Sequence, residues 1–81
     1  MLKKINVINK KLYGICLWNN NNLFVGCEDK TIKLININND KIIKSLSGHE
    51  GSVITIKKII HQKYGECLIS YGEDIILWKK N

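Results

Sequence analysis

Seven short runs of strand-favouring residues, separated by turn-forming residues, set the strongest limit on how this chain can fold. The runs recur about every ten residues, and no window carries a long apolar stripe with helical spacing. They extend over residues 12–18, 23–27, 31–37, 41–46, 52–60, 67–71 and 75–79. The chain holds 15 Ile and no Ala, so intrinsic propensity also disfavours helix. We therefore expect an all-β protein.

Composition excludes several classes of protein. No apolar stretch approaches the ~20 residues that a membrane span needs. Residues 1–12 carry lysines rather than the apolar core of a secretory signal. The three cysteines are an odd number for a disulfide framework and form no CxxC motif. We expect reduced thiols in an intracellular protein, in the cytoplasm or the nucleus, with no membrane contact.

The net charge of +6 arises from 13 Lys, with no Arg in the 81 residues. An AT-rich genome readily encodes Ile, Lys and Asn, so the charge carries little functional weight by itself. Non-specific binding of nucleic acid or another anionic surface is an alternative function. The absence of Arg disfavours base readout, because Arg paired with guanine is the commonest specific contact.

The residue types that carry catalysis or bind metals show no productive spacing. The two histidines and three cysteines lack the close pairs, two to four residues apart, that are typical of zinc sites. Cys67, with His61 and Asp74, is a poor candidate for a hydrolase, because a Cys in a strand-like run is usually a small buried apolar residue. No Gly-rich phosphate loop is present. We predict no metal, no cofactor and no catalytic residue.

An internal repeat narrows the architecture. Residues 32–37 and 68–78 are apolar on both faces of the expected strand, so their sheets must be covered on both sides. Residues 23–35 align with residues 68–78, since each segment passes from an apolar run through a Gly and a Glu-Asp pair to a second apolar run. A period of about 43 residues with four strands per copy is that of a propeller blade.

On these residues the chain resembles the WD-repeat family, in which each repeat runs from a Gly-His pair to a Trp-Asp pair. Gly48 and His49 open the second copy, and Leu77, Trp78 and Lys79 close it. The first copy keeps the turn residue Asp29 but is degenerate, because Ile35 stands where the family has Trp. The resemblance covers residues 12–79, nearly the whole chain.

The resemblance implies two four-stranded antiparallel blades of an incomplete β-propeller, which occupies residues 1–81 as one partial domain. Residues 2–37 would form the first repeat and residues 41–79 the second, with residues 2–8 as an outer strand before the first. Two blades cannot close a ring, because propellers have typically 4–8 blades. Further blades are therefore expected, either in cis, with this chain as a fragment of a larger protein, or by self-assembly.

The resemblance also implies a buried structural tetrad in the second copy, formed by His49, Ser70, Asp74 and Trp78. The residue types suit a chain of hydrogen bonds from the carboxylate through the imidazole and hydroxyl to the indole. In the first copy Val25 replaces the Ser, so that copy is expected to depend on apolar packing. Asp29 is expected to accept the amides of residues 30 and 31 as a turn residue.

The family implies a scaffold that binds proteins or peptides and has no chemistry of its own. Its usual binding face is built from turns and loops at one end of the blades. Those positions are here Glu28, Glu50, Gly51, Ser52 and Glu73. The three glutamates would suit a basic peptide. A purely structural segment of a multidomain protein is a further alternative.

Overall fold

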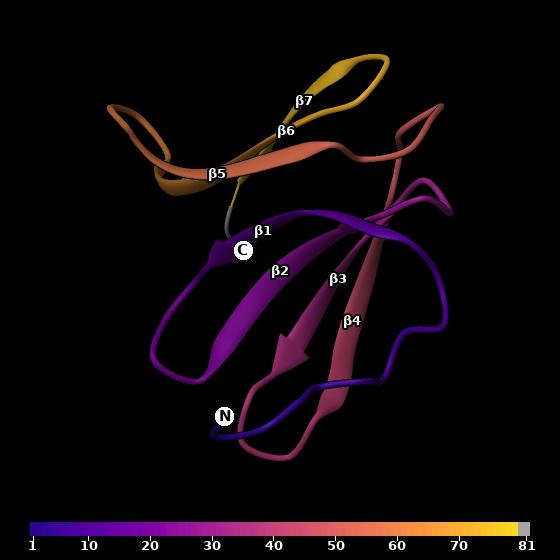
Figure 1. Ribbon diagram of the computed structural model, residues 1–81. Coiled ribbons are helices and arrows are strands. Elements are labelled where there is room, and N and C mark those ends of the chain that lie inside the picture. The colour runs from indigo at the N-terminus through magenta and orange to yellow at the C-terminus, as the bar shows by residue number, and fades with distance from the viewer. Residues whose placement is uncertain (80–81) are drawn as a thin grey trace.

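The computed structural model describes residues 1–79, which form seven β-strands and no helix (Figure 1). The strands pair antiparallel in chain order, β1 to β4 in a first sheet and β5 to β7 in a second. They are β1 (Leu12–Leu17), β2 (Asn22–Cys27), β3 (Thr31–Asn36), β4 (Lys41–Ser47), β5 (Thr55–His61), β6 (Gly65–Tyr71) and β7 (Ile75–Lys79). The expected all-β, antiparallel class is confirmed. Among the described residues no helix is available that could cross a membrane.

Asparagine side chains shape the turns at one end of the first sheet. The Asn19 side-chain oxygen accepts the backbone N–H groups of Asn21 and Asn22, both at 2.9 Å. Asn36 accepts the N–H of Asn38 at 2.8 Å in the same way. Such local bonds satisfy backbone donors that a strand would otherwise direct to a neighbour. The Asn-rich stretches therefore fix where β1 and β3 end.

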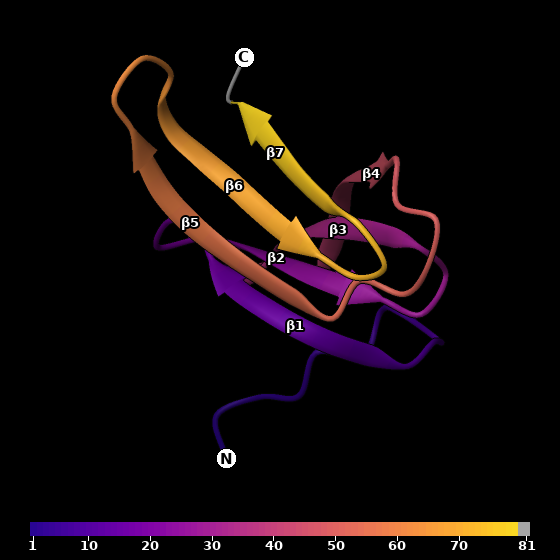
Figure 2. The ribbon, with the colours of Figure 1, turned by 90° about the horizontal axis from the view of Figure 1, so that it is seen from above.

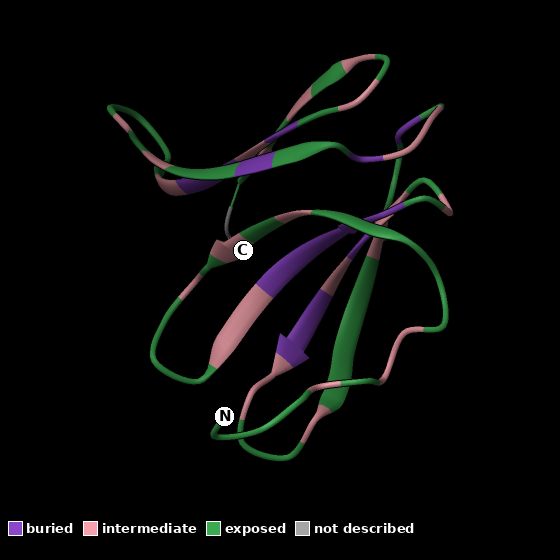
Figure 3. Ribbon diagram, in the orientation of Figure 1, coloured by how far each residue is buried: buried purple, intermediate pink, exposed green. Residues whose placement is uncertain are grey.

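The core lies between the two sheets. Phe24 and Leu34 from the first sheet meet Ile56 and Leu68 from the second, and all four are buried (Figure 3). Strands β1 and β5 lie side by side in both ribbon views, whereas β4 and β7 do not approach each other (Figures 1 and 2). The sheets are therefore close along one side and diverge toward the other.

A short connector, residues 52–54, leads from the loop after β4 into β5 and is bonded to both sheets. Val53 is fully buried, and its N–H donates to the Cys27 carbonyl at the end of β2 at 3.1 Å. The N–H of Ile54 donates to the Tyr71 carbonyl at the end of β6 at 2.8 Å. Residues 52–54, which the sequence predicts to begin a strand, are therefore outside β5, since their N–H groups serve two different sheets.

The connector passes so close to strand β2 and to the β6–β7 turn that only glycine fits at the two points of contact. A Cβ atom at Gly26 would fall on the Val53 carbonyl oxygen, and one at Gly72 would fall on the Ser52 carbonyl oxygen. Backbone oxygens cannot move aside as a flexible side chain can. These two glycines therefore permit the close approach that holds the sheets together.

The N-terminal segment, residues 1–11, precedes β1. The sequence predicts an outer strand over residues 2–8, and this prediction is wrong, because residues 1–9 form no strand. The Lys3 ammonium donates to the Ile37 carbonyl at 2.7 Å and pairs with Asp40 at 2.7 Å. At its other end, the N–H of Lys11 donates to the Glu28 carboxylate at 2.9 Å. The segment is therefore tied to two turns of the first sheet.

The N-terminal segment explains how the first sheet is buried on its second face. Val25 and Ile35 alternate with the core residues Phe24 and Leu34, so they point away from the second sheet. Both are nevertheless buried, at 4% and 3% exposed. Figure 1 shows the N-terminal segment crossing the first sheet. Apolar packing in the first copy, expected from the sequence, is thus observed.

The second sheet has three strands, where the repeat predicts four. Strand β4, which the repeat boundaries place in the second repeat, pairs with β3 across a short turn. Strands joined by a short connection usually pair with each other. The short turn between β3 and β4 therefore places β4 in the first sheet. The two sheets therefore divide the chain at the connector rather than before residue 41.

We predict that Val53→Ala lowers the free energy of unfolding by about 2 kcal/mol, since it leaves a cavity between the sheets. Urea unfolding followed by tryptophan fluorescence measures the change. Ile54→Ala is the matched control, because Ile54 is the next residue, is larger, and is 43% exposed. A smaller loss at Val53 than at Ile54 would contradict the central place given to the connector.

Candidate functional site

The structure brings the four residues of the expected tetrad into one hydrogen-bonded chain. His49 lies in the loop after β4, Ser70 on β6, Asp74 in the β6–β7 turn and Trp78 on β7. The His49 Nδ1 atom lies 2.7 Å from Asp74 Oδ1, and His49 Nε2 lies 2.6 Å from Ser70 Oγ. The Trp78 indole N–H donates to the same Ser70 oxygen at 2.8 Å. This tetrad ties the loop before the connector to the central strand β6 and the edge strand β7 of the second sheet.

The donors and acceptors of the tetrad match when His49 is neutral. An ionised Asp74 only accepts, so His49 Nδ1–H donates to it, and His49 Nε2 is left to accept the Ser70 hydroxyl proton. Ser70 and His49 are 1% and 7% exposed. Buried polar groups must be satisfied in this way, because an unpaired one costs about 1–3 kcal/mol.

The order acid, imidazole, hydroxyl also occurs in hydrolytic triads, so the chemistry of Ser70 decides the interpretation. Its hydroxyl is buried, and its oxygen already accepts the Trp78 indole N–H. A nucleophile needs an exposed oxygen with a free lone pair directed at a substrate. The geometry therefore favours a structural role for the tetrad.

We expect Ser70→Ala to lower the free energy of unfolding by about 1–3 kcal/mol, because it leaves the His49 and Trp78 nitrogens unpaired. Urea unfolding again provides the measurement. Ser45→Ala is the matched control, since Ser45 is exposed on β4 and only accepts a bond from Lys33 at 2.8 Å. Equal losses for the two variants would show that the tetrad does not stabilise the fold.

Asp29 closes the β2–β3 turn of the first sheet. Its carboxylate accepts the Thr31 hydroxyl at 2.6 Å and the Thr31 N–H at 3.2 Å, and it pairs with Lys33 at 3.2 Å. Burial would raise the pKa of Asp29, but the bonds from Thr31 and then Lys33 outweigh it and hold the pKa below its usual value. The expected bond to the residue 31 amide is present, whereas the Lys30 N–H donates to Cys27 instead.

Burial, and then the negative charge of Asp29, raise the pKa of the neighbouring Cys27 thiol. Cys27 is fully buried. A thiol that is both protonated and inaccessible is a poor nucleophile. Cys27 therefore acts as a small apolar residue of the first sheet.

The lowered pKa of Asp29 predicts a loss of stability in acid. The carboxylate stabilises the fold above its unfolded pKa, and this contribution disappears as the pH falls through the lower folded pKa. Asp29→Asn lacks the contribution, so its free energy of unfolding should decrease less than that of the wild type between about pH 5 and about pH 3. Thr31→Val keeps the acid but removes its strongest donor, and NMR titration should show the pKa of Asp29 rising. Parallel pH profiles for wild type and Asp29→Asn would contradict the assignment.

The residues predicted to bind a partner come together at one end of the molecule. They lie in the β2–β3 turn, the loop before β5 and the β6–β7 turn, which are neighbours in Figure 1. The Ser52 hydroxyl donates to the Glu28 carbonyl at 3.3 Å, and Gly51 lies against the Glu73 side chain. We call the three exposed glutamates, Glu28, Glu50 and Glu73, the acidic rim.

The acidic rim is not wholly free. One Glu28 oxygen already accepts the Lys11 N–H at 2.9 Å, so the N-terminal segment engages part of it. The side chains of Glu50 and Glu73 make no polar contact within residues 1–79 and remain exposed. A cationic ligand would therefore meet mainly Glu50 and Glu73.

The remaining motif positions have packing roles. Gly48 lies against the Trp78 ring, where a Cβ atom would be 3.2 Å from the indole. Ile35 is buried, at 3% exposed. Leu77, in contrast, is 45% exposed on the face of β7 opposite Trp78. These residues shape the two sheets and do not form part of the acidic rim.

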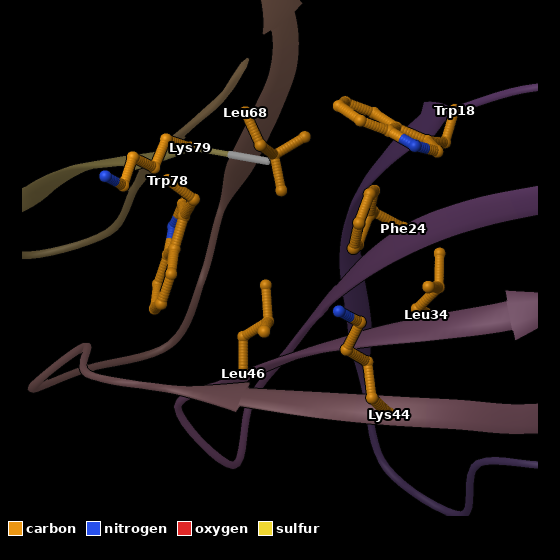
Figure 4. Close-up of a pocket in the computed structure, with 8 residues that line it drawn as sticks. All are labelled: Trp18, Phe24, Leu34, Lys44, Leu46, Leu68, Trp78 and Lys79. Atoms are coloured by element: carbon orange, nitrogen blue, oxygen red, sulfur yellow. The ribbon is translucent and has the colours of Figure 1, made fainter. Parts of the chain in front are cut away.

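A groove between the diverging sheets is the feature that the sequence does not predict. It has a volume of about 460 Å³ (Figure 4). Its lining residues come from both sheets and are Trp18, Phe24, Leu34, Lys44, Leu46, Leu68, Trp78 and Lys79. Trp18 at the end of β1 is the one sequence signal for the groove. The sequence did not predict its role, because the sequence of one strand does not show which residues of another sheet its side chains face.

Comparison of the chain with models of known protein families gives no match. No curated protein matches it either. The WD-repeat assignment therefore stays a prediction from the residues themselves.

Proposed function

We propose that the chain is a WD-repeat-like scaffold that binds proteins or peptides and has no chemistry of its own. The observation that carries the proposal is the hydrogen-bonded tetrad, which joins the four residues at the positions that the resemblance implies. Two antiparallel sheets that meet along β1 and β5 and diverge outward are compatible with neighbouring blades. Three free cysteines support a reducing, intracellular location.

The outer face of the second sheet supports the expectation of further blades. Tyr71, Ile75 and Leu77 share this face and are 52%, 69% and 45% exposed. A contiguous apolar surface of this kind usually marks an interaction site. In a ring of blades, the next sheet would cover it.

The isolated 81-residue chain should therefore associate through this face. Size-exclusion chromatography with light scattering, together with circular dichroism, should show a discrete trimer or tetramer if copies close the ring, which would give six or eight blades. Aggregate or an unfolded monomer would mean that other blades must be supplied in cis. Leu77→Lys should reduce association, and the control Asn20→Lys, which adds the same charge at an exposed residue of the β1–β2 turn, should not. A folded, monodisperse monomer would contradict the ring.

The acidic rim is the proposed binding surface for a basic peptide. A fluorescent octalysine probe should bind the wild type, and the triple variant Glu28→Gln, Glu50→Gln, Glu73→Gln should bind it at least about fivefold more weakly, as lost surface ion pairs predict. A control that neutralises Asp40 and Glu66 tests the effect of net charge, because those acids pair with lysines elsewhere. Equal weakening of probe binding in both variants would show only a general effect of net charge and would contradict the acidic rim as the binding surface.

The alternative of anionic partners has less support. Lys3, Lys33 and Lys58 are each paired with an acid, at 2.7, 3.2 and 2.8 Å. Such pairing reduces the positive field that a phosphate backbone would meet. We therefore place the nucleic-acid alternative second.

A further inference from the structure

Strand β7 is an unprotected sheet edge. Within residues 1–79 it pairs only with β6, and its residues 75–78 are Ile, Ile, Leu and Trp, with no proline and no break in register; its one charge is Lys79 at its end. Proteins usually block such edges with charges or bulges, since they otherwise pair with another strand. The outer edge of the first sheet follows that rule, because β4 carries Lys41 and Lys44 and a register shift. Strand β7 has one lysine, at its last position, and a regular register, so the edge formed by residues 75–78 is open to pairing with a further strand.

The groove lies beside this edge. Because the second sheet has three strands and the first has four, the inner face of β4 looks across the groove rather than onto a strand. Leu46 and Lys44 of β4 form one wall and Trp78 of β7 forms another (Figure 4). A fourth strand added to β7 would therefore run along this groove.

The aromatic walls of the groove are held in place before any ligand arrives. The Trp78 indole is fixed by its bond to Ser70 at 2.8 Å. The Trp18 ring packs edge-to-face on Phe24, with ring centroids 5.3 Å apart, and the Lys58 ammonium lies 4.8 Å from its centre. Pre-organised walls lower the entropic cost of binding.

The positive charge of the groove favours an occupant with negative charge. Its charged lining residues are both lysines, Lys44 and Lys79, and no acid lines it. The Lys79 ammonium lies 5.6 Å from the Tyr64 ring. The Lys44 ammonium is directed into the groove in Figure 4 and has no hydrogen-bond or ion-pair partner within residues 1–79. An acidic side chain on the occupant would satisfy it.

The N-terminal segment of the chain does not fit this requirement. It carries Lys3 and Lys4, which would repel Lys44, and its Lys3 and Lys11 ends are bonded to turns of the first sheet. A separate acidic segment is therefore the better match by charge.

We propose that the β7 edge and the adjoining groove bind an extended segment of a partner protein, which adds to the second sheet as a fourth strand. Its groove-facing side chains are apolar, with one acidic residue opposite Lys44. Main-chain bonds to β7 supply affinity, and the groove supplies sequence preference. The surface is separate from the acidic rim, so it does not depend on the binding proposed there.

The test uses the full chain and a capped heptapeptide, Thr-Leu-Thr-Glu-Thr-Leu-Thr, whose Leu and Glu side chains share one strand face. Both tryptophans line the groove, so saturable binding should change the intrinsic fluorescence. Lys44→Glu should weaken binding about tenfold and should favour the peptide with Lys in place of Glu. Lys57→Glu, which makes the same charge change on the opposite face of the second sheet, should leave binding unchanged.

Three results would overturn the proposal. One is equal binding of the Glu and Lys peptides to the wild type. Another is a loss for Lys57→Glu equal to that for Lys44→Glu. The third concerns two peptides, each N-methylated at alternate residues so that one edge of the peptide strand loses its N–H donors. Undiminished binding of both peptides would overturn the proposal, since one of them lacks the donors that pair with β7. Lys44 is exposed, so circular dichroism of Lys44→Glu should match the wild type, and Lys44→Met provides a second variant that keeps the apolar stem.

Discussion

The connector between the sheets is the constraint on which the rest of the structure depends. Val53 fills the space between the sheets, and the N–H groups of Val53 and Ile54 each bond to a different sheet. Gly26 and Gly72 admit the connector because neither has a Cβ atom to block it. A small protein gains only a few kcal/mol from one core. A single buried segment that fixes both sheets therefore decides their relative placement.

The tetrad extends this constraint to the surface. His49 lies just before the connector, so fixing the connector also places the imidazole between Asp74 and Ser70. Ser70 in turn orients the Trp78 ring, which forms a wall of the groove. Such networks are worth more together than separately, because each bond prevents the burial of an unpaired neighbour. The same polar contacts thus stabilise the fold and shape one wall of the groove.

The sequence predicts the strand positions, which depend on local turn chemistry. It does not predict the connector or the groove, which depend on contacts between residues remote in sequence. The strands lie within a few residues of the predicted runs, since turn residues such as Asn19 and Asp29 end them locally. The connector was missed because Val and Ile favour strands wherever they lie, while its hydrogen-bond partners are remote in sequence. Residues 2–8 form no strand, and Lys3 in this segment bonds instead to the β3–β4 turn, a contact remote in sequence. The groove depends on the distance between β4 and β7, and this distance cannot be predicted from the sequence of either strand alone.

The unequal sheets give the molecule two surfaces of opposite character. Turns from both sheets place Glu28, Glu50 and Glu73 at one end. The missing fourth strand of the second sheet leaves a lysine-lined apolar groove at the side. Lys58 illustrates how the positive charges are constrained, since its ammonium bonds the Trp18 carbonyl and pairs with Glu66. Lys44 lacks such a partner within the described part of the chain, so its charge is available to a ligand. Charge placement, rather than the net charge of +6, therefore determines what each surface can recognise.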